Sequence, residues 1–199
     1  ALELLTESRA LRSGTLRIVA DAAHHLLHIL GHFRKKYPGV QVSVRSGNTE
    51  TVIGSLYSYD ADIGVLGELP TGRDFEMLKL NSTPIIAFAA VDYPLAGARS
   101  VTLKQLSAQP LVMRERGSKT RQKLEALAAA SKIELKPAIE AEGREAVREI
   151  VASGAGVGFV SAAEFGQDSR LAAITIDGPE MLMDEALICL RERSSGKLV

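Results

Sequence analysis

The chain has 199 residues, of which 46% are hydrophobic, and its Lys and Arg residues (24) balance its Asp and Glu residues (24). A domain that grips DNA through phosphates carries a clear basic excess, so this neutral stretch is a poor candidate for binding DNA by itself. The single cysteine, Cys189, excludes a disulfide framework, and no apolar run has the about 18 to 20 residues of a membrane span.

Residues 1–12 place leucines on a helical stripe, and they begin with neither an initiating Met nor a cationic signal region. We therefore expect the end of a helix that enters from upstream in a longer protein. Ser13-Gly14 is expected to stop this helix.

The apolar period then switches repeatedly between about 2 and about 3.6 residues, the periods of strands and helices. It predicts, in order, a strand at 15–19, a helix from 26 to 37, a strand at 40–44, a helix at 48–57 and a strand at 62–66. This alternation indicates right-handed crossovers and a largely parallel sheet.

A pair of strands at 75–80 and 85–91 is predicted next, ended by Tyr93-Pro94. A second α/β set follows, with strands at 111–113, 138–141 and 157–160, helices at 118–130 and 145–152, and strand-like segments at 171–176 and 185–191. The fold class is therefore α/β with two Rossmann-like lobes. We expect lobe I to comprise 13–88 and 167–199 and lobe II to comprise 89–166, with crossings on strands near 87–91 and 161–167.

Ligands of open α/β sheets sit beyond the carboxyl ends of the strands, where helix N-termini point. Here these places are expected to face one another across a cleft between the lobes. The candidate ligand-contacting residues at them are Asp21, Ala22, Ala23, His24, His25, Ser46, Asn48, Thr49, Arg114, Arg116, Gly117, Ser118, Lys119, Thr120, Arg121, Gly143, Arg144 and Glu145.

The stretch from Arg114 to Arg121 is the most informative, because it follows a strand and opens a helix. Gly117 lets the backbone approach a ligand, and Ser118 is a natural N-cap. The amides of the helix start and the basic side chains suit an anion. The alternative is a capped helix with solvated charges. Ser46-Gly47-Asn48-Thr49 repeats the design in the first lobe.

All four histidines fall within nine residues, and His24, His28 and His32 share a helix face. No Asp, Glu or Cys lies nearby on that face to complete a tetrahedral zinc site, so we expect a half-exposed polar face and no metal. His24 and His25 follow a strand directly, where they could donate hydrogen bonds to a ligand.

Asp21 has two readings. Its carboxylate can cap the helix that follows, and this is the more common role for Asp at such a position. It can also pair with the ammonium group of a zwitterionic ligand whose acid group is held by the helix starts and the arginines.

The glycine-rich run from Gly154 to Gly158 is not a dinucleotide loop, because a helix precedes it and a strand follows. Cys189 lies in a predicted strand and is expected to be an inert core residue. Nothing in the sequence assembles a nucleophile, a base and an orienting group. We therefore expect neither catalysis nor a cofactor.

Several stretches, in order and with matching spacing over about 13–193, resemble the effector-binding domain of LysR-type transcriptional regulators. They are 13–18, 33–40, 60–65, 92–96, 114–121 and, for the closing helix and strand, 145–161. The chain departs from the family pattern at Asp21 to His25, where Ser or Thr often stands, and at Arg144, where a small polar residue is common.

The resemblance implies a fold like type 2 periplasmic binding proteins, with a small effector held between two lobes. It also implies a winged helix-turn-helix DNA-binding domain upstream, residues 1–12 being the end of its linker helix. Members of the family act as cytoplasmic tetramers in which these domains pair side by side, without a membrane.

Within the family, the 114–121 loop and the His-rich first helix look closest to regulators linked to phosphonate use. The hypothesis is an anionic or zwitterionic effector with an oxyanion group, 2-aminoethylphosphonate being one example. A solute-binding protein of a transporter shares the fold and is the alternative, which a secretory signal upstream would favour. An enzyme would need a catalytic set that the sequence lacks.

Overall fold

The structure is a computed structural model that describes residues 14–21, 26–67 and 73–194. Its contacts divide the chain into two compact units, unit 1 being Ala1–Asn81 with Asp184–Val199 and unit 2 being Ser82–Met183. The expected lobe boundaries were 88/89 and 166/167, whereas the units meet at 81/82 and 183/184. The helix expected at 1–12 lies outside the described residues.

Unit 1 contains the first α/β set. Its elements are β1 (Gly14–Ala20), α2 (Leu26–Lys36), β2 (Val40–Ser46), α3 (Thr49–Tyr57) and β3 (Ile63–Leu66). β1 pairs in parallel with both β2 and β3, and β10 (Leu182–Leu190) adds to β3 in the antiparallel direction. The predicted strand-helix alternation and the parallel pairing are confirmed here.

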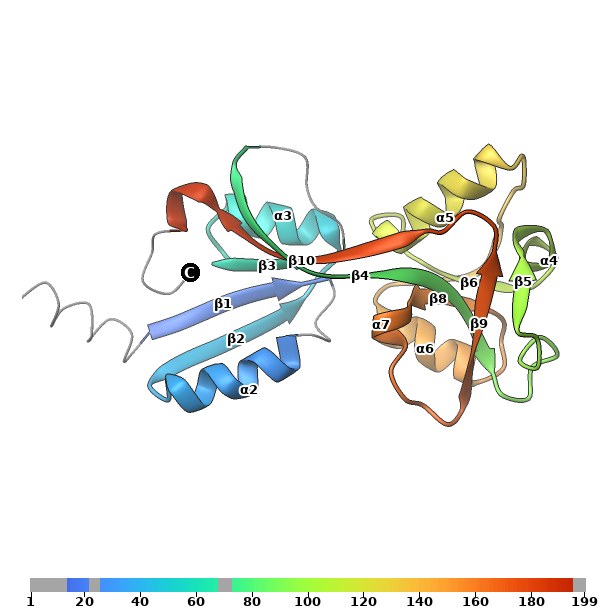
Figure 1. The fold of residues 1–199 in the computed structure, drawn as a ribbon, viewed down its shortest axis with the longest axis horizontal. Helices are drawn as coiled ribbons and strands as arrows, with labels where there is room; N and C mark the ends of the chain where they lie inside the picture. The colour runs from blue at the N-terminus through green and yellow to red at the C-terminus, as the bar shows by residue number, and fades with distance from the viewer. Residues whose placement is uncertain (1–13, 22–25, 68–72, 195–199) are drawn as a thin grey trace, which may run out of the picture. The chain divides into compact units, whose positions relative to one another are not determined.

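The core of unit 1 follows the alternation of side chains along β1. Leu16 and Ile18 are buried on the face that carries α2, with Leu26 of that helix beside them. Val19 points to the other face, where it packs with Val52 of α3. The two helices accordingly flank β1–β3 within unit 1 (Figure 1).

A buried carboxylate ties three segments of unit 1 together. Asp62, 5% exposed, accepts hydrogen bonds from the Arg17 backbone N–H (2.9 Å), Nε (3.1 Å) and Nη2 (2.8 Å). It also accepts one from Nη2 of Arg193 (2.7 Å), on the short 3-10 helix η1 (Arg191–Arg193). The start of β3 is thereby linked to β1 and to the end of the described chain.

Unit 2 contains the second α/β set. Its elements are β5 (Ser100–Thr102), α4 (Leu103–Ser107), β6 (Leu111–Arg114), α5 (Lys119–Ala130), β7 (Pro137–Ala141), α6 (Arg144–Ala152), β8 (Gly158–Ser161), α7 (Ala162–Phe165) and β9 (Leu171–Asp177). β6 pairs in parallel with β7, and β5 pairs in parallel with β9. The short elements β5, α4 and α7 were not predicted.

In unit 2, helices likewise pack against both faces of β6. Leu111 and Met113 of β6 are buried together with Leu124 of α5. Val112 points the other way and packs with Val147 and Val151 of α6. No helix among the described residues of either unit is long and apolar enough to cross a membrane.

The expected pair of strands at 75–80 and 85–91 is wrong, because this segment is one continuous strand, β4 (Phe75–Ala90). The polar run Asn81-Ser82-Thr83-Pro84 resembles a turn in sequence. Segments distant in sequence nevertheless supply hydrogen-bond partners for the backbone of this strand. β8 and β9 pair antiparallel with its second half, and the Ile85 N–H donates to the Met181 carbonyl (2.8 Å). β4 and β10 are the strands that continue from one unit into the other.

Candidate functional site

In unit 1 the loops after β1 and β2 meet. The Gly47 N–H donates to the Ala20 carbonyl (3.1 Å), and the Thr49 hydroxyl donates to Asp21 Oδ2 (3.2 Å). Asn48 caps α3, its Oδ1 accepting from the Thr51 N–H (2.9 Å). The structure thus brings together two of the predicted residues, Asp21 and Thr49.

Part of the predicted site lies outside the described residues, namely Ala22, Ala23, His24 and His25. Ser46 is exposed at the end of β2, and His32 is exposed on α2. The residues that the structure describes contain no group of three or more His, Cys, Asp or Glu side chains placed to hold a metal ion.

In unit 2 a pocket opens near the carboxyl end of β6. Its polar lining consists of Arg114 at the end of β6, Thr120 in the first turn of α5, Arg144 and Arg148 on α6, and Glu164 on α7. Apolar side chains of β4, α6 and β8 complete it. Three of the predicted residues, Arg114, Thr120 and Arg144, therefore line one pocket.

The start of α5 presents buried hydroxyl groups. Ser118 occupies the predicted N-cap position and is 1% exposed, but its side chain makes no capping hydrogen bond. Thr120, two residues on, is 9% exposed. Because the Ser118 hydroxyl does not cap the helix, capping does not explain why a serine stands there.

Arg121 points inward and braces the loop. It is 5% exposed, and its guanidinium donates to the Arg114 carbonyl (2.8 Å), to Glu140 (2.6 Å) and to Glu125 (2.7 Å). Burial opposes the charged form, but the two carboxylates outweigh burial and raise the pKa of Arg121. This side chain links α5 to the ends of β6 and β7, and it does not line the pocket.

Glu115 links the starts of α5 and α6. Arg114 donates to it through Nε (2.9 Å) and Nη2 (2.8 Å), and the Gly143 N–H donates to its Oε2 (3.2 Å). Burial alone would raise the pKa of Glu115, but these hydrogen bonds, led by those of Arg114, lower it. Gly143 has φ = 82°, a conformation that favours glycine.

The remaining predicted residues of unit 2 are more peripheral. Arg116 and Glu145 are exposed, and Gly117 and Lys119 are half-buried. None of these four lines the pocket. Their contact with a ligand stays a prediction.

Sequence reasoning missed Arg148 and Glu164, both of which line the pocket. Nη1 of Arg144 donates to Glu164 Oε1 (2.6 Å), with side-chain exposures of 20% and 9%. Arg148 lies one helical turn after Arg144 on α6 and donates to the carbonyl of Phe165, the last residue of α7. Both arginines therefore hold α7. The spacing of four residues between them is the signal that places them on one helix face.

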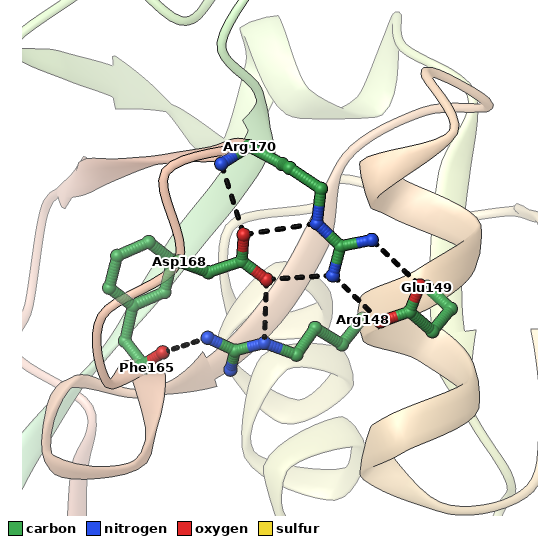
Figure 2. Close-up of polar contacts among 5 residues, drawn as sticks. All are labelled: Arg148, Glu149, Phe165, Asp168 and Arg170. Carbon is green, nitrogen blue, oxygen red and sulfur yellow. Dashed lines mark hydrogen bonds and ion pairs between the residues drawn. The ribbon is translucent and has the colours of Figure 1, made fainter.

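Figure 2 shows the network that orients Arg148. Asp168 accepts from Nε of Arg148 (3.4 Å) and from the backbone N–H, Nε and Nη2 of Arg170 (3.0, 3.1 and 2.9 Å). Arg170 in turn makes a bidentate pair with Glu149 (2.9 and 2.8 Å). These hydrogen bonds, chiefly those of Arg170, hold the pKa of Asp168 well below its ordinary value.

Asp168→Asn is expected to lower the thermal midpoint by about 2 to 4 °C, because the amide keeps some hydrogen bonds but loses the charge shared by two arginines. Differential scanning calorimetry at neutral pH measures the shift. Asp92→Asn, an exposed aspartate of the same unit, is the control and should leave the midpoint unchanged. Equal midpoints for both variants would contradict a stabilising role of the network.

The pocket of unit 2 offers groups that can bind a ligand through hydrogen bonds and charge. Three arginines, a threonine hydroxyl and apolar side chains converge on one pocket. Guanidinium groups bind carboxylates and phosphate-type oxyanions in a planar, often bidentate geometry. The polar lining of the pocket accordingly suits an acid group.

Comparison with known proteins agrees with a regulatory domain. A family model described as "LysR substrate binding domain" matches residues 9–199. The transcriptional activator CmpR of Synechocystis is 27% identical over 92% of this chain. The chain spans 59% of the length of CmpR and 55% of a CbbR regulator of Rhizobium meliloti.

Solved structures share the fold. The CcmR regulatory domain of Synechocystis, determined in complex with 2-PG, superposes with a TM-score of 0.79 at 27% identity, covering 90% of this chain and 88% of that one. The effector-binding domain of QuiR, in complex with shikimate, superposes with a TM-score of 0.79 at 18% identity and covers 94% of this chain and 92% of that one. The second likeness shows the fold alone.

Proposed function

This chain belongs to the LysR substrate-binding domain family, and we propose that it senses a small oxyanion-bearing metabolite for a LysR-type transcriptional regulator. It is a regulatory domain rather than an enzyme, because the relatives it matches are named as transcriptional regulators. The observation that carries the choice of ligand is the pocket of unit 2, where Arg114, Arg144 and Arg148 converge beside Thr120.

The acid group of the effector is proposed to bind these arginines and the hydroxyls of Ser118 and Thr120. Ser118 does not line the pocket, but it is buried two residues before Thr120 and does not cap α5 with its side chain, which supports this role. 2-Aminoethylphosphonate is the example that we carry forward. The pairing of Asp21 with an ammonium group of the effector, which the sequence suggested, stays a prediction.

The regulator is proposed to act as a cytoplasmic homo-oligomer that binds DNA through a domain upstream of this chain. An effector that binds one arrangement of the assembly better than another shifts the population toward it. The coupling free energy between effector binding and DNA binding is set by the factor by which one changes the affinity for the other. Differential effector binding therefore suffices to control transcription without chemistry on the ligand.

A thermal-shift panel tests the ligand class. It comprises 2-aminoethylphosphonate, other phosphonates, phosphate, sulfate, sulfite, carboxylates and 2-PG. A ligand at about 100 times its Kd adds about 2.7 kcal/mol, which raises the midpoint by several degrees. A selective shift by an oxyanion supports the proposal. Shifts by none of these compounds contradict it.

Ser118→Ala is expected to weaken the binding of the ligand found in the panel by about 10- to 100-fold, the usual effect of losing a buried hydrogen bond to a charged group. Isothermal titration calorimetry measures the change. Ser131→Ala, at the other end of α5 and exposed, is the matched control and should bind like the parent chain. Unchanged affinity of the Ser118 variant would remove this hydroxyl from the site.

A further inference from the structure

The pocket of unit 2 contains a carboxylate as well as arginines. Glu164 is the one acidic side chain among the described residues that line it. Its side chain is 9% exposed, and its Oε1 lies 2.6 Å from Nη1 of Arg144. An acid group that approaches Arg144 therefore meets a buried negative charge already bound there.

The other two arginines of the pocket each have a carboxylate partner outside its lining. Arg114 pairs with Glu115 and Arg148 pairs with Asp168, and neither of these carboxylates lines the pocket. Glu115 is further held by the Gly143 N–H, and Asp168 by Arg170. Glu115 and Asp168 thus orient an arginine from outside the pocket lining. Glu164, in contrast, is part of the lining that the proposed ligand would contact.

We propose that Glu164 determines the charge of the ligand, so that the site selects acids that also carry an ammonium group. This proposal rests on the proposed function and deepens it. An anion without a positive group is repelled by the Glu164 carboxylate, and the repulsion is strong because the site is largely removed from water. An ammonium group turns the same carboxylate into a partner, while the arginines hold the acid group.

Selection of this kind is specificity by repulsion of the wrong ligand. The arginines attract every oxyanion, so attraction alone does not separate an aminophosphonate from a phosphonate of the same size. Glu164 discriminates between them because its carboxylate attracts the ammonium group of the first ligand and repels the second, which has none. It is the counterpart in unit 2 of the role that the sequence suggested for Asp21 in unit 1.

The test compares 2-aminoethylphosphonate with ethylphosphonate, which lacks the amine, by isothermal titration calorimetry on the 199-residue chain. The parent chain is expected to bind the amine-bearing ligand at least about tenfold more tightly. Glu164→Gln is expected to tighten ethylphosphonate binding and to weaken 2-aminoethylphosphonate binding, which brings the ratio of the two Kd values close to one. Glu164→Asp keeps the charge and is expected to keep the preference.

Glu134→Gln is the matched control, since it removes one negative charge from an exposed ion pair of the same unit. It should leave the ratio of Kd values unchanged. An unchanged ratio in Glu164→Gln overturns the proposal, as does an equal change in the Glu134 variant. If Asp21→Asn brings the ratio of Kd values close to one and Glu164→Gln does not, the ammonium group pairs with Asp21, and the proposal for Glu164 is overturned as well.

The failure of the proposed function looks different. If neither phosphonate, nor any oxyanion of the panel, binds the parent chain, the oxyanion class itself is wrong and the selectivity proposal falls with it. Binding without dependence on Glu164 overturns the selectivity alone. Circular dichroism of each variant ensures that a lost preference is measured on folded protein.

Discussion

Asp62→Ala is expected to lower the free energy of unfolding by about 3 kcal/mol, near the lower end of the range for breaking a buried ion pair. The side chain accepts four hydrogen bonds, and its loss leaves the Arg17 N–H and two guanidinium groups without their acceptor. The lower end applies because the side chain of Arg17 is 40% exposed and water can replace part of the interaction. Urea denaturation measures the change.

The same group makes stability depend on pH in a fixed direction. Burial opposes ionisation of Asp62, but the hydrogen bonds from Arg17 and Arg193 outweigh it and lower its pKa. The stabilisation is therefore complete above the ordinary Asp pKa of about 3.9 and is lost as the pH falls through the lower pKa of the folded state. The gap between the parent chain and the variant should narrow below about pH 4.

Asp60→Ala is the control, because this neighbouring aspartate is exposed. It is expected to change the free energy of unfolding by less than about 0.5 kcal/mol. Equal losses in the two variants would show that the Asp62 cluster does not stabilise unit 1.

Gly156→Ala is expected to cost about 3 kcal/mol or more, or to prevent folding of unit 2. An added Cβ would lie 2.2 Å from the Pro110 carbonyl oxygen and 3.0 Å from its carbon, both backbone atoms. That oxygen accepts the Val157 N–H (2.9 Å), and the Val157 carbonyl accepts the Val112 N–H (2.9 Å). The segment before β8 and the start of β6 would have to separate, breaking these hydrogen bonds.

Gly97→Ala provides the matched control, since nothing lies within 4 Å of a Cβ built there. It should change the free energy of unfolding by less than about 0.5 kcal/mol. Thermal denaturation followed by circular dichroism compares the three chains. A Gly156 variant as stable as the Gly97 variant would mean that the two strands move apart at little cost.

Local periodicity was enough to predict much of the fold. The alternation Leu16-Arg17-Ile18-Val19 and the helical spacing of Leu26, Leu30 and Phe33 predict β1 and α2, because each pattern reflects burial of one side of a single element. The α5 and α6 ranges agree with their predictions to within one residue at each end.

The continuity of β4 was not predictable in this way. Asn81 to Pro84 have turn-like composition, and the strand persists because β8, β9 and Met181 supply hydrogen-bond partners from far along the chain. Such partners leave no local trace in the sequence. The unit boundaries differ from the expected lobe boundaries for the same reason. β9 was expected in lobe I, but it pairs with β4 inside unit 2.

Three residues that line the pocket of unit 2 were predicted, and the reasons are again local. Arg114, Thr120 and Arg144 were expected because they stand at strand-to-helix junctions. Arg148 was missed although its position four residues after Arg144 marks the same helix face. Glu164 lies on a helix of four residues between two strands, and its place beside Arg144 depends on how β8 returns to α6.

The two bonds that Arg144 and Arg148 make to α7 limit how this pocket can change in evolution. Each arginine is both a lining group and a support for the chain segment that follows β8. Under the proposed function, replacing either one is expected to alter ligand binding and to loosen α7 in a single mutational step. Val147 and Val160 also line the pocket, and both belong to the buried core of unit 2, so they too combine lining with packing. Substitutions at these lining positions should therefore cost stability as well as alter the pocket.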